Sequence, residues 1–421
     1  MVVNVYRVVL AASLAVVFGC GDTAPESSLP GEVVRSSMRR RAPSEELGDV
    51  RALARNDADF AFELLRELPS DENLFFAPHS ISTALAMTYA GAAGSTAREM
   101  REALHFAQEP EVLHQAFNTL DQLLASRGEG QPDTDGEPFR LSVVDGLFAQ
   151  RGFPLRDRYL DDLARWYGAE VALLDFAADP ESARGAINAW AAEATEGRVE
   201  ELLSARAVGP STRFVAVDAL TFRAAWKHRF SERATMDRPF TRLDGSTVSV
   251  PTMWGESAVG FAEGAGWRAT RIPYVGDAVS LLAVVPDDLA AFEEELDAER
   301  IEHIAGQVER GFVYVALPRF AIRSRLELED ALRGLGMREA FDDADFSSLS
   351  SDERLALGGV VHEAFVRVDE EGTEAVGATA STGTSISVSP TLRIDRPFLF
   401  FIRDQETGAV LFVGRVVDPS A

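Results

Sequence analysis

Residues 368–390 read Val-Asp-Glu-Glu-Gly-Thr-Glu-Ala-Val-Gly-Ala-Thr-Ala-Ser-Thr-Gly-Thr-Ser-Ile-Ser-Val-Ser-Pro. A solvated loop normally carries proline and charge, yet between Gly372 and Ser389 there is no proline and only one charged residue, Glu374. The absence of proline leaves every backbone N–H of that span free to join the hydrogen-bond ladder of a sheet. The composition also suits a flexible Gly/Ser/Thr linker, so the rest of the chain has to decide between a strand and a linker.

A strand formed here would have one row of small side chains. Side chains alternate across a strand, so if Glu374 faces water its odd-numbered neighbours face the other way. Those neighbours are Thr373, Ala375, Gly377 and Thr379. Such a row fits a strand that enters a sheet between two others over a packed core, where a large or charged side chain would be overpacked or desolvated.

The composition indicates a globular protein that does not bind nucleic acid. The chain has 421 residues, of which 46% are hydrophobic, so a large core is available. Lys and Arg total 41 against 67 Asp and Glu, which gives a formal net charge of −26. A nucleic-acid backbone requires a basic stripe that neutralises phosphates, and none occurs. The acidic balance favours solubility instead.

The N-terminus reads as an export signal. Arg7 supplies a positive charge, and residues 8–18 form an apolar run that is too short to span a bilayer as a mature helix. The run ends in Val-Val-Phe-Gly-Cys, which resembles a bacterial lipobox, although Phe18 departs from the small residue usual there. Cys20 is the only cysteine of the chain and would become the lipidated first residue. An unlipidated secretory signal is the alternative.

These features divide the chain into three parts. We expect a signal peptide over residues 1–19, a lipidated flexible tether over 20–48 and a folded domain over 49–421, because the middle segment is rich in Ser, Pro, Glu and Arg and poor in apolar residues. The protein should therefore be exported and held to a membrane through the lipid on Cys20, in the periplasm or at the cell surface, or else be secreted.

Hydrophobic periodicity predicts that helices dominate the first part of the domain and strands the rest. Helices are expected over residues 60–68, 81–90, 111–126, 158–167, 180–195 and 326–335, and another begins at 96. Strands are expected over residues 73–77, 139–150, 213–222, 248–254, 267–273, 279–285, 313–317, 355–369, 398–402 and 410–417. Ser80 is placed to cap the helix that follows it, and Thr96 with Glu99 has the spacing of a capping box. Without βαβ alternation or an internal repeat, this is an α+β arrangement.

The sequence carries no recognisable enzyme site. None of the six histidines lies in a His-Glu-x-x-His motif, and there is no Gly-x-Ser-x-Gly, phosphate-loop or dinucleotide motif. Ser80, Asp218 and His362 could be imagined as a catalytic triad, but each lies within an apolar stretch, where a buried structural role is far commoner. We expect no metal and no cofactor. The helix over 111–126 has no Lys/Arg cluster, so a heparin-like polyanion site is not expected either.

Several separated segments of the chain together resemble the serpins. They are Asn73-Leu-Phe-Phe-Ala-Pro-His-Ser-Ile-Ser, Val217-Asp-Ala-Leu-Thr-Phe-Arg-Ala-Ala-Trp226, Leu317-Pro-Arg-Phe, Val361-His-Glu-Ala-Phe-Val-Arg-Val-Asp-Glu-Glu-Gly-Thr-Glu-Ala, Arg396-Pro-Phe-Leu-Phe and Leu411-Phe-Val-Gly-Arg-Val-Val-Asp-Pro. Their order and spacing match the family over essentially the whole of residues 49–421. The resemblance implies the serpin fold, with three β-sheets, about nine helices and an exposed reactive-centre loop.

The resemblance also implies a mechanism. In serpins a target protease cuts the reactive loop, and the cut loop inserts into the central sheet while the protease is still attached as an acyl-enzyme. Residues 368–390 fall on this loop, and counting from Glu370 through the hinge, or back from Pro397, places the cut bond between Ile386 and Ser387. The implied partner is a protease, held covalently by a monomeric, metastable inhibitor that acts as a suicide substrate.

The hinge between sheet and loop distinguishes inhibitors from other serpins. Non-inhibitory members typically carry proline or bulky charged residues there, whereas this hinge matches the inhibitory pattern and only Val376 is enlarged. The hinge residues are Glu370, Gly372, Thr373, Glu374, Ala375, Val376, Gly377, Ala378 and Thr379. We therefore expect an inhibitor, and a non-inhibitory binding or chaperone-like serpin is the alternative.

The residue before the cut bond predicts the class of target. Trypsin-like enzymes need Lys or Arg, of which there is none between 372 and 392, and caspase-like enzymes need Asp, of which the nearest is Asp395. An aliphatic residue such as Ile386 between small polar ones fits elastase-like, subtilisin-like or chymotrypsin-like serine proteases. A papain-like cysteine protease is a further alternative.

Other residues match positions that support loop insertion in the family. A polar cluster beneath the strands that open comprises Ser80, Asp218 and His362. In it Asp218 replaces the usual Asn, and Ala77 stands where the family keeps Ser. Trp226 matches a residue under the point of insertion, where Arg319 could pair with Glu370. Ordinary core or surface packing is the alternative for each of them.

Overall fold

The structure is a computed structural model that describes residues 29–127, 140–195, 197, 199, 201–205, 207–351, 356–373 and 390–421. Within these ranges, the side chains of residues 140–145, 218–221, 257–259, 309, 310 and 312 are not described. Several predicted features lie outside the described residues and stay predictions. They are the signal peptide, Cys20, the hinge residues Glu374, Ala375, Val376, Gly377, Ala378 and Thr379, and the bond between Ile386 and Ser387.

Nine α-helices lie in the described part of the chain, in agreement with the predicted number. They are α1 (Gly48–Glu67), α2 (Pro78–Tyr89), α3 (Gly94–Ala103), α4 (Pro110–Ser126), α5 (Asp157–Trp166), α6 (Pro180–Ala194), α7 (Leu289–Glu294), α8 (Ala298–Gln307) and α9 (Glu329–Gly334). The helices expected before residue 200 are all present, although α1 begins at Gly48 rather than near Phe60. Neither α7 nor α8 was expected from the periodicity of the sequence.

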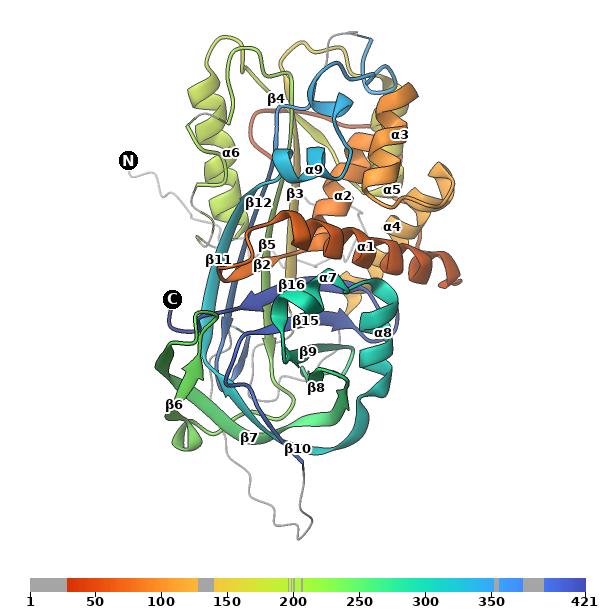
Figure 1. Cartoon of the computed structure of the whole chain (residues 1–421). Helices are drawn as coiled ribbons and strands as arrows, with labels where there is room; N and C mark the ends of the chain where they lie inside the picture. The colour runs from red at the N-terminus through yellow and green to blue at the C-terminus, as the bar shows by residue number, and fades with distance from the viewer. Residues whose placement is uncertain are drawn as a thin grey trace, which may run out of the picture.

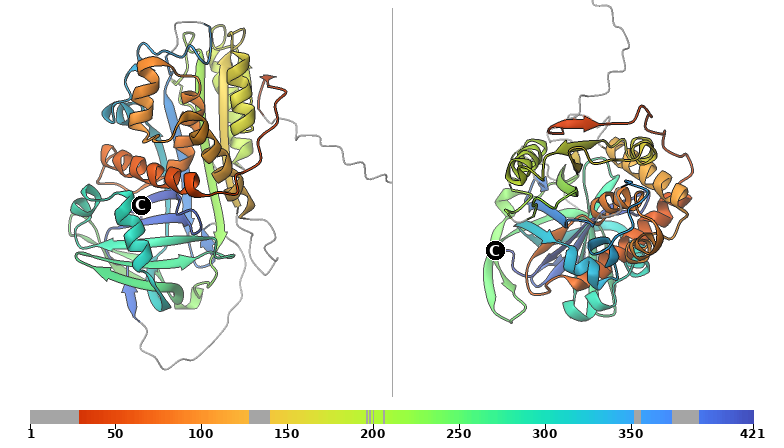
Figure 2. Two further views of the ribbon diagram at one scale, coloured as in Figure 1. Left: turned by 90° about the vertical axis from the view of Figure 1, so that its right-hand side faces the viewer. Right: turned by 90° about the horizontal axis from the view of Figure 1, so that it is seen from above.

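A seven-stranded sheet runs along the length of the molecule (Figure 1). In order across the sheet, its strands are β1 (Glu32–Val34), β4 (Val171–Leu174), β3 (Arg140–Gln150), β5 (Phe214–Ala225), β13 (Gly372–Thr373), β12 (Val360–Val368) and β11 (Phe320–Glu327). On one face α6 packs against Phe148, Val215 and Val217 in a small hydrophobic cluster. The helices α1 to α5 lie on the other face, which the larger hydrophobic core covers (Figure 2).

The other nine strands form one hydrogen-bonded array that divides into two sheets at β7. They are β2 (Leu74–Phe76), β6 (Met236–Thr241), β7 (Thr247–Gly264), β8 (Trp267–Pro273), β9 (Val279–Pro286), β10 (Glu309–Pro318), β14 (Thr391–Arg393), β15 (Phe398–Asp404) and β16 (Val410–Val416). The start of β7 pairs with β6, and β10 links β7 to β14. The end of β7 pairs with β8, and this second sheet continues through β9, β15, β16 and β2. With the seven-stranded sheet, these make the three sheets that the resemblance implies.

The start of α2 differs from the prediction. The helix begins at Pro78, whose fixed φ suits the first turn, so Ser80 lies inside the helix and does not cap it. The whole helix is buried, as its nearly continuous apolar sequence predicts.

The predicted capping box of α3 is also wrong. The helix begins at Gly94, and both Thr96 and Glu99 lie inside it. There they accept hydrogen bonds from a distant segment, Thr96 Oγ1 from the Asp345 N–H (2.9 Å) and the Glu99 carboxylate from the backbone N–H groups of residues 338 and 339 (2.8 Å each). The capping-box spacing therefore reflects tertiary contacts rather than a local cap.

The predicted helix over residues 326–335 is wrong in its first part. β11 extends to Glu327, and α9 begins only at Glu329. Buried residues largely alternate with exposed ones along β11, and Leu326 lies opposite His362 of β12. A short helical pattern directly after a strand conceals the boundary between them, because a few apolar residues satisfy both periods.

Residues 29–47, which we name the N-terminal strap, pack against the domain. Within the strap, β1 adds to the edge of the seven-stranded sheet by pairing with β4. The Arg40 side chain then donates to Asn118 Oδ1 (3.0 Å), and the Arg41 N–H donates to the Arg165 carbonyl (2.8 Å). The predicted flexible tether is therefore wrong for the strap, because a strand ladder and charged contacts that composition does not reveal hold it in place.

No helix of the described residues is long and apolar enough to cross a membrane. The described part of the chain also does not bring together three side chains of the kinds that hold a metal ion.

Candidate functional site

The predicted reactive loop leaves the seven-stranded sheet through a tight hairpin. After β12 the chain reverses over two glutamates into β13, and the Asp369 N–H donates to the Gly372 carbonyl across this turn (3.0 Å). β13 is antiparallel to both of its neighbours: Thr373 lies opposite Val368 of β12 and opposite Ala224 of β5. The beginning of the hinge is thus already a strand between β5 and β12.

Gly372 and Thr373 fit this position for different reasons. A Cβ on Gly372 would lie 2.2 Å from the carbonyl oxygen of Ala224, so only glycine lets β13 approach β5 this closely. Thr373 is fully buried, and its hydroxyl oxygen lies 2.8 Å from that of Tyr274. The side chain points inward, which is the orientation expected of the small-residue row.

Beyond β13, β5 and β12 pair directly with each other. This pairing, which we name the seam, is parallel and runs from Ala216 and Val360 to Thr221 and Phe365. Parallel ladders are slightly less stable per residue than antiparallel ones. A strand that continued β13 into the seam would be antiparallel to both neighbours and would replace one parallel ladder with two antiparallel ladders. The pairing of the sheet can therefore increase by insertion at the seam.

Trp226 binds the hairpin through its side chain and its backbone. The indole N–H donates to the Asp369 carbonyl (2.8 Å), and the backbone N–H donates to the Glu371 carbonyl (2.9 Å). The indole also stacks on Tyr274, with 4.6 Å between ring centroids and 9° between the planes. Burial raises the pKa of Tyr274, so its hydroxyl is neutral when it meets Thr373. The stack thereby links the turn to the first inserted residue.

Glu370 anchors the turn from inside the protein. The residue is only 2% exposed, and its carboxylate accepts from Arg319 Nε (2.8 Å) and from the Thr235 hydroxyl. Its carbonyl accepts from the Phe230 N–H (3.0 Å). Burial also raises the pKa of the neighbouring Asp369. The structure brings Arg319 and Glu370 together as the resemblance suggests, and their part in insertion stays a prediction.

The polar cluster lies at the seam. His362 in β12 is fully buried and lies opposite Asp218 of β5, whose side chain is outside the description. Its Nε2 accepts from the Ala77 N–H (3.1 Å). Ser80 is buried in α2. Because the histidine nitrogen already holds a backbone hydrogen bond inside the core, the arrangement suits a structural role better than that of a catalytic base.

Sequence reasoning missed three residues that contact the hairpin, which are Tyr274, Thr235 and Phe230. Tyr274 follows directly on the predicted strand over 267–273, and that strand is present as β8. No local pattern indicates that its hydroxyl meets Thr373, because that contact depends on how strands far apart in sequence pair.

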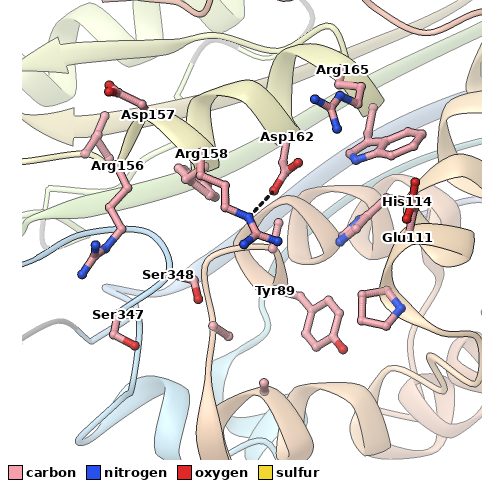
Figure 3. A pocket seen from close by; sticks show the side chains of 17 residues that line it. Tyr89, Glu111, His114, Arg156, Asp157, Arg158, Asp162, Arg165, Ser347 and Ser348 are labelled. Carbon is pink, nitrogen blue, oxygen red and sulfur yellow. Dashed lines mark ion pairs between the residues drawn. The ribbon is translucent and has the colours of Figure 1, made fainter.

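A separate pocket of about 980 Å³ lies beside α4, α5 and Ser347, away from the hairpin (Figure 3). Its charged side chains are three arginines and three carboxylates, Arg156, Arg158, Arg165, Glu111, Asp157 and Asp162. One pair is close, with Arg158 Nε 4.0 Å from Asp162 Oδ2. Because the charges balance, the pocket does not offer the basic surface that a polyanion requires.

Comparisons with known proteins agree on one family. A family model described as serpin (serine protease inhibitor) matches residues 55–419. An uncharacterized serpin-like protein of Thermococcus kodakarensis is 38% identical over 368 residues, which cover 86% of this chain and 84% of that protein. The leukocyte elastase inhibitor of Homo sapiens is 33% identical over 378 residues, covering 86% and 97%. The solved structure of the thermophilic serpin tengpin in its native state aligns with a TM-score of 0.79 at 25% identity, over 91% of this chain and 97% of that one.

Proposed function

Because this chain belongs to the serpin family, we propose that it inhibits serine proteases as a suicide substrate. The observation that carries the proposal is β13, because the hinge begins as a strand between β5 and β12 and faces a parallel seam into which it can extend. Membership of this family also agrees with the prediction that the chain is not an enzyme.

The proposed reaction begins as ordinary peptide hydrolysis. The serine hydroxyl of the protease attacks the carbonyl carbon of Ile386, and its proton passes through the base of the protease to the departing amine of Ser387. An ester then joins Ile386 to the protease. Water would hydrolyse that ester and release active protease, so insertion of the freed hinge has to move and distort the protease first. The trap is therefore kinetic.

The register of β13 predicts where inserted residues would lie. Continued antiparallel to both neighbours, Ala375 would lie beside Phe222, and Thr379 would lie between Asp218 and His362. Phe222 and His362 are buried, so this row would face the core, where only small side chains fit. About a dozen inserted residues at roughly 3.3 Å each would carry the protease roughly 40 Å.

The proposed targets are elastase-like, subtilisin-like or chymotrypsin-like proteases. Ile386 supports this choice, since an aliphatic residue precedes the cut bond and no Lys, Arg or Asp lies close to it. The human relative at 33% identity is named for inhibition of leukocyte elastase.

Incubation with elastase, subtilisin and chymotrypsin, followed by denaturing gels, tests the proposal. We expect a covalent band with at least one protease, and a released C-terminal peptide whose sequence begins at Ser387. A papain arm tests the cysteine-protease alternative. Clipped fragments without any covalent band would contradict inhibition and leave a binding or chaperone-like serpin.

We also propose that the protein is exported and lipidated at Cys20, which the apolar run before this single cysteine supports. Membrane fractionation of cells that make the full chain tests this, with Cys20→Ala and globomycin treatment as the comparisons. Cys20→Ala should lower the share of the protein in the membrane fraction, because it removes the lipid. Globomycin blocks the cut before Cys20, so treated cells should accumulate a heavier precursor that keeps residues 1–19. An unchanged distribution of Cys20→Ala together with an unchanged protein mass under globomycin would contradict lipidation.

A further inference from the structure

We propose that the N-terminal strap contains a cleavage site for trypsin-like proteases, at the bond between Arg39 and Arg40, and that this cut releases the domain from the membrane. The cut is ordinary peptide hydrolysis, in which water supplies a hydroxyl to the new carboxyl group of Arg39 and a proton to the new amine of Arg40. The release rests on the proposed lipidation of Cys20, because the cut lies between this residue and the domain. The cleavage itself does not depend on the lipid.

A run of three arginines marks the site in the sequence. Residues 38–41 read Met-Arg-Arg-Arg. The chain has 41 Lys and Arg residues, and this run is the only place where any of them are adjacent. Trypsin-like proteases bind the side chain before the cut bond in a pocket that requires Lys or Arg. The run therefore offers such a protease several neighbouring bonds within one segment.

The backbone around the three arginines is exposed and irregular. Between β1, which ends at Val34, and α1, which begins at Gly48, the strap forms neither a helix nor a strand, and it runs along the outside of the molecule (Figure 2). All of residues 37–43 except Arg40 are exposed. Exposed irregular segments are preferred sites of proteolytic cleavage, because no helix or sheet has to open before the protease binds the backbone.

The contacts of the strap select the bond after Arg39. The Arg41 N–H donates to the Arg165 carbonyl (2.8 Å), and the Arg41 carbonyl accepts from Asn118 Nδ2 (3.0 Å). A protease attacks a carbonyl whose oxygen accepts hydrogen bonds from its oxyanion hole, so the bond after Arg41 is protected. The Arg40 side chain donates to Asn118 Oδ1 (3.0 Å) and is held away from a specificity pocket. Arg39 is exposed and lies before both of these anchored residues.

The predicted reactive loop does not compete for the same proteases. Between residues 372 and 392 there is no Lys or Arg, so a trypsin-like protease has no bond to cut there. Proteases that prefer an aliphatic side chain would instead cut the loop after Ile386. The two classes of protease therefore act on different segments of the chain, one on the reactive loop and the other on the strap.

The cut separates the lipid from a domain that keeps its main strap contacts. Arg40 and Arg41 stay with the domain, and so do their contacts with α4 and α5. The segment before the cut contacts the domain through the three residues of β1 and a few side chains, among them Arg35, whose Nε lies 3.2 Å from Glu170 Oε1. A strand this short is not held once the covalent link that kept it near the sheet is broken. The domain then leaves the membrane with its hairpin intact.

Limited digestion of the full chain tests the site. Membranes that carry the protein are treated with a low concentration of trypsin, and the released protein is quantified and its N-terminus sequenced. We expect a soluble product that begins at Arg40. Arg39→Gln should slow release at least fivefold, and Arg39→Lys, which trypsin accepts, should stay within threefold of wild type. Arg35→Gln is the matched control in the same strap, because Arg35 is also exposed, and it should stay within twofold.

A released product that begins elsewhere, or equal release of Arg39→Gln and wild type, would overturn the site. Slow release of Arg39→Lys would also overturn it, because the effect of Arg39→Gln would then not reflect the specificity of the protease. Digestion in detergent separates the site from the anchor, because it requires no membrane. A cut after Arg39 in detergent, in a protein that is absent from the membrane fraction, would support the site and contradict lipidation alone.

Discussion

Thr373 occupies the most restrictive position of the hinge. Its side chain is fully buried where β13 separates β5 from β12, and its hydroxyl is paired with that of Tyr274. The space between β5 and β12 therefore limits the volume of the side chain at position 373, and the Tyr274 hydroxyl favours a polar one. A side chain that cannot enter here keeps the following residues out of the seam as well, since they enter in order along the strand.

Thr373→Arg should convert the inhibitor into a substrate. The guanidinium would have to be buried without a partner beside Tyr274, which costs several kcal/mol. On denaturing gels with the protease that wild type traps, we expect cleaved chain and little covalent complex. Thr373→Ser, which keeps the hydroxyl, is the matched control. An undiminished covalent band for Thr373→Arg would count against insertion as the mechanism.

Glu374 is the only charged residue between Gly372 and Ser389, and the register of β13 gives a reason for its negative charge. Thr373 pairs with Ala224 of β5 and with Val368 of β12. If the strand continued in this register, Glu374 would lie on the outer face of the sheet, between Arg223 and Arg367. Arg367 is exposed and has no ion pair with a described residue. The Glu374 carboxylate would then lie between the positive charges of Arg223 and Arg367 and would reduce their mutual repulsion.

Glu374→Lys should slow insertion, because a third positive charge would join the two arginines. Each like-charge contact costs up to about 1 kcal/mol. We expect the number of inhibitor molecules consumed per protease inhibited to rise at least twofold, with Glu374→Gln between wild type and Glu374→Lys. The effect should shrink in high salt. Equal stoichiometries for the lysine variant and wild type would refute this arrangement.

At the scale of elements, the N-terminal strap adds stability that its composition does not suggest. Arg40 contacts Asn118 and Asp121 of α4, and Arg41 lies over the Trp166 ring at 5.3 Å. Together with β1, these contacts join the sheet edge to α4 and α5.

The double variant Arg40→Ala/Arg41→Ala should destabilise the native state by about 1–3 kcal/mol, because it removes partly buried charge-assisted hydrogen bonds and a cation–π contact. The urea midpoint of native-state unfolding is the measurement. Arg158→Ala, whose side chain is 93% exposed, should change it by no more than about 0.5 kcal/mol. An unchanged midpoint for the double variant would mean that the strap contributes nothing to stability.

His114 of α4 gives this helix a pH dependence. Burial lowers the pKa of His114 from 6.5 to about 4, so the folded chain keeps the ring neutral while the unfolded chain protonates it near pH 6.5. Between these values the unfolded state binds more protons, so stability should fall as pH decreases from 6.5 to 4, by roughly 3 kcal/mol from this residue. His114→Gln should lose this part of the dependence when urea midpoints at pH 7 and pH 4.5 are compared. Equal pH dependence in both chains would contradict it.

Elements with a single strong period could be predicted from the sequence. The strand predicted over 267–273 is present as β8, and the predicted terminal hairpin is present as β15 paired with β16. Both predictions succeeded because the hydrophobic pattern of these segments fits a strand and does not fit a helix. β11 was not predicted, although buried and exposed residues alternate along most of it, and its last two residues were assigned to the following helix. The cap of α3 was misassigned because Thr96 contacts a distant segment. At the site, the inward side of Thr373 followed from alternation, whereas Tyr274 depends on tertiary pairing that no local pattern contains.

At the scale of the whole molecule, the pairing of the seven-stranded sheet is compatible with the proposed insertion of one more strand. Its central seam is parallel, while β13 at the end of the seam is already antiparallel to both neighbours. Completing β13 would pair about ten more residues on both sides. The uncut loop prevents this, because both of its ends are fixed in sheets, one through β12 and the other through β14. The native chain is therefore expected to be less stable than the cut chain.

The thermal unfolding midpoint before and after cleavage of the loop tests this central claim most directly. The chain would be cut in the loop by a protease that cleaves it without forming a covalent band, the protease removed, and the cut mapped to the residues between Thr379 and Pro390. The account predicts a midpoint at least about 10 °C higher for the cut chain, because two new ladders at about 1 kcal/mol per hydrogen bond outweigh the parallel ladder that is lost. An unchanged or lower midpoint, the usual result of a nick in an exposed loop, would contradict insertion at the seam.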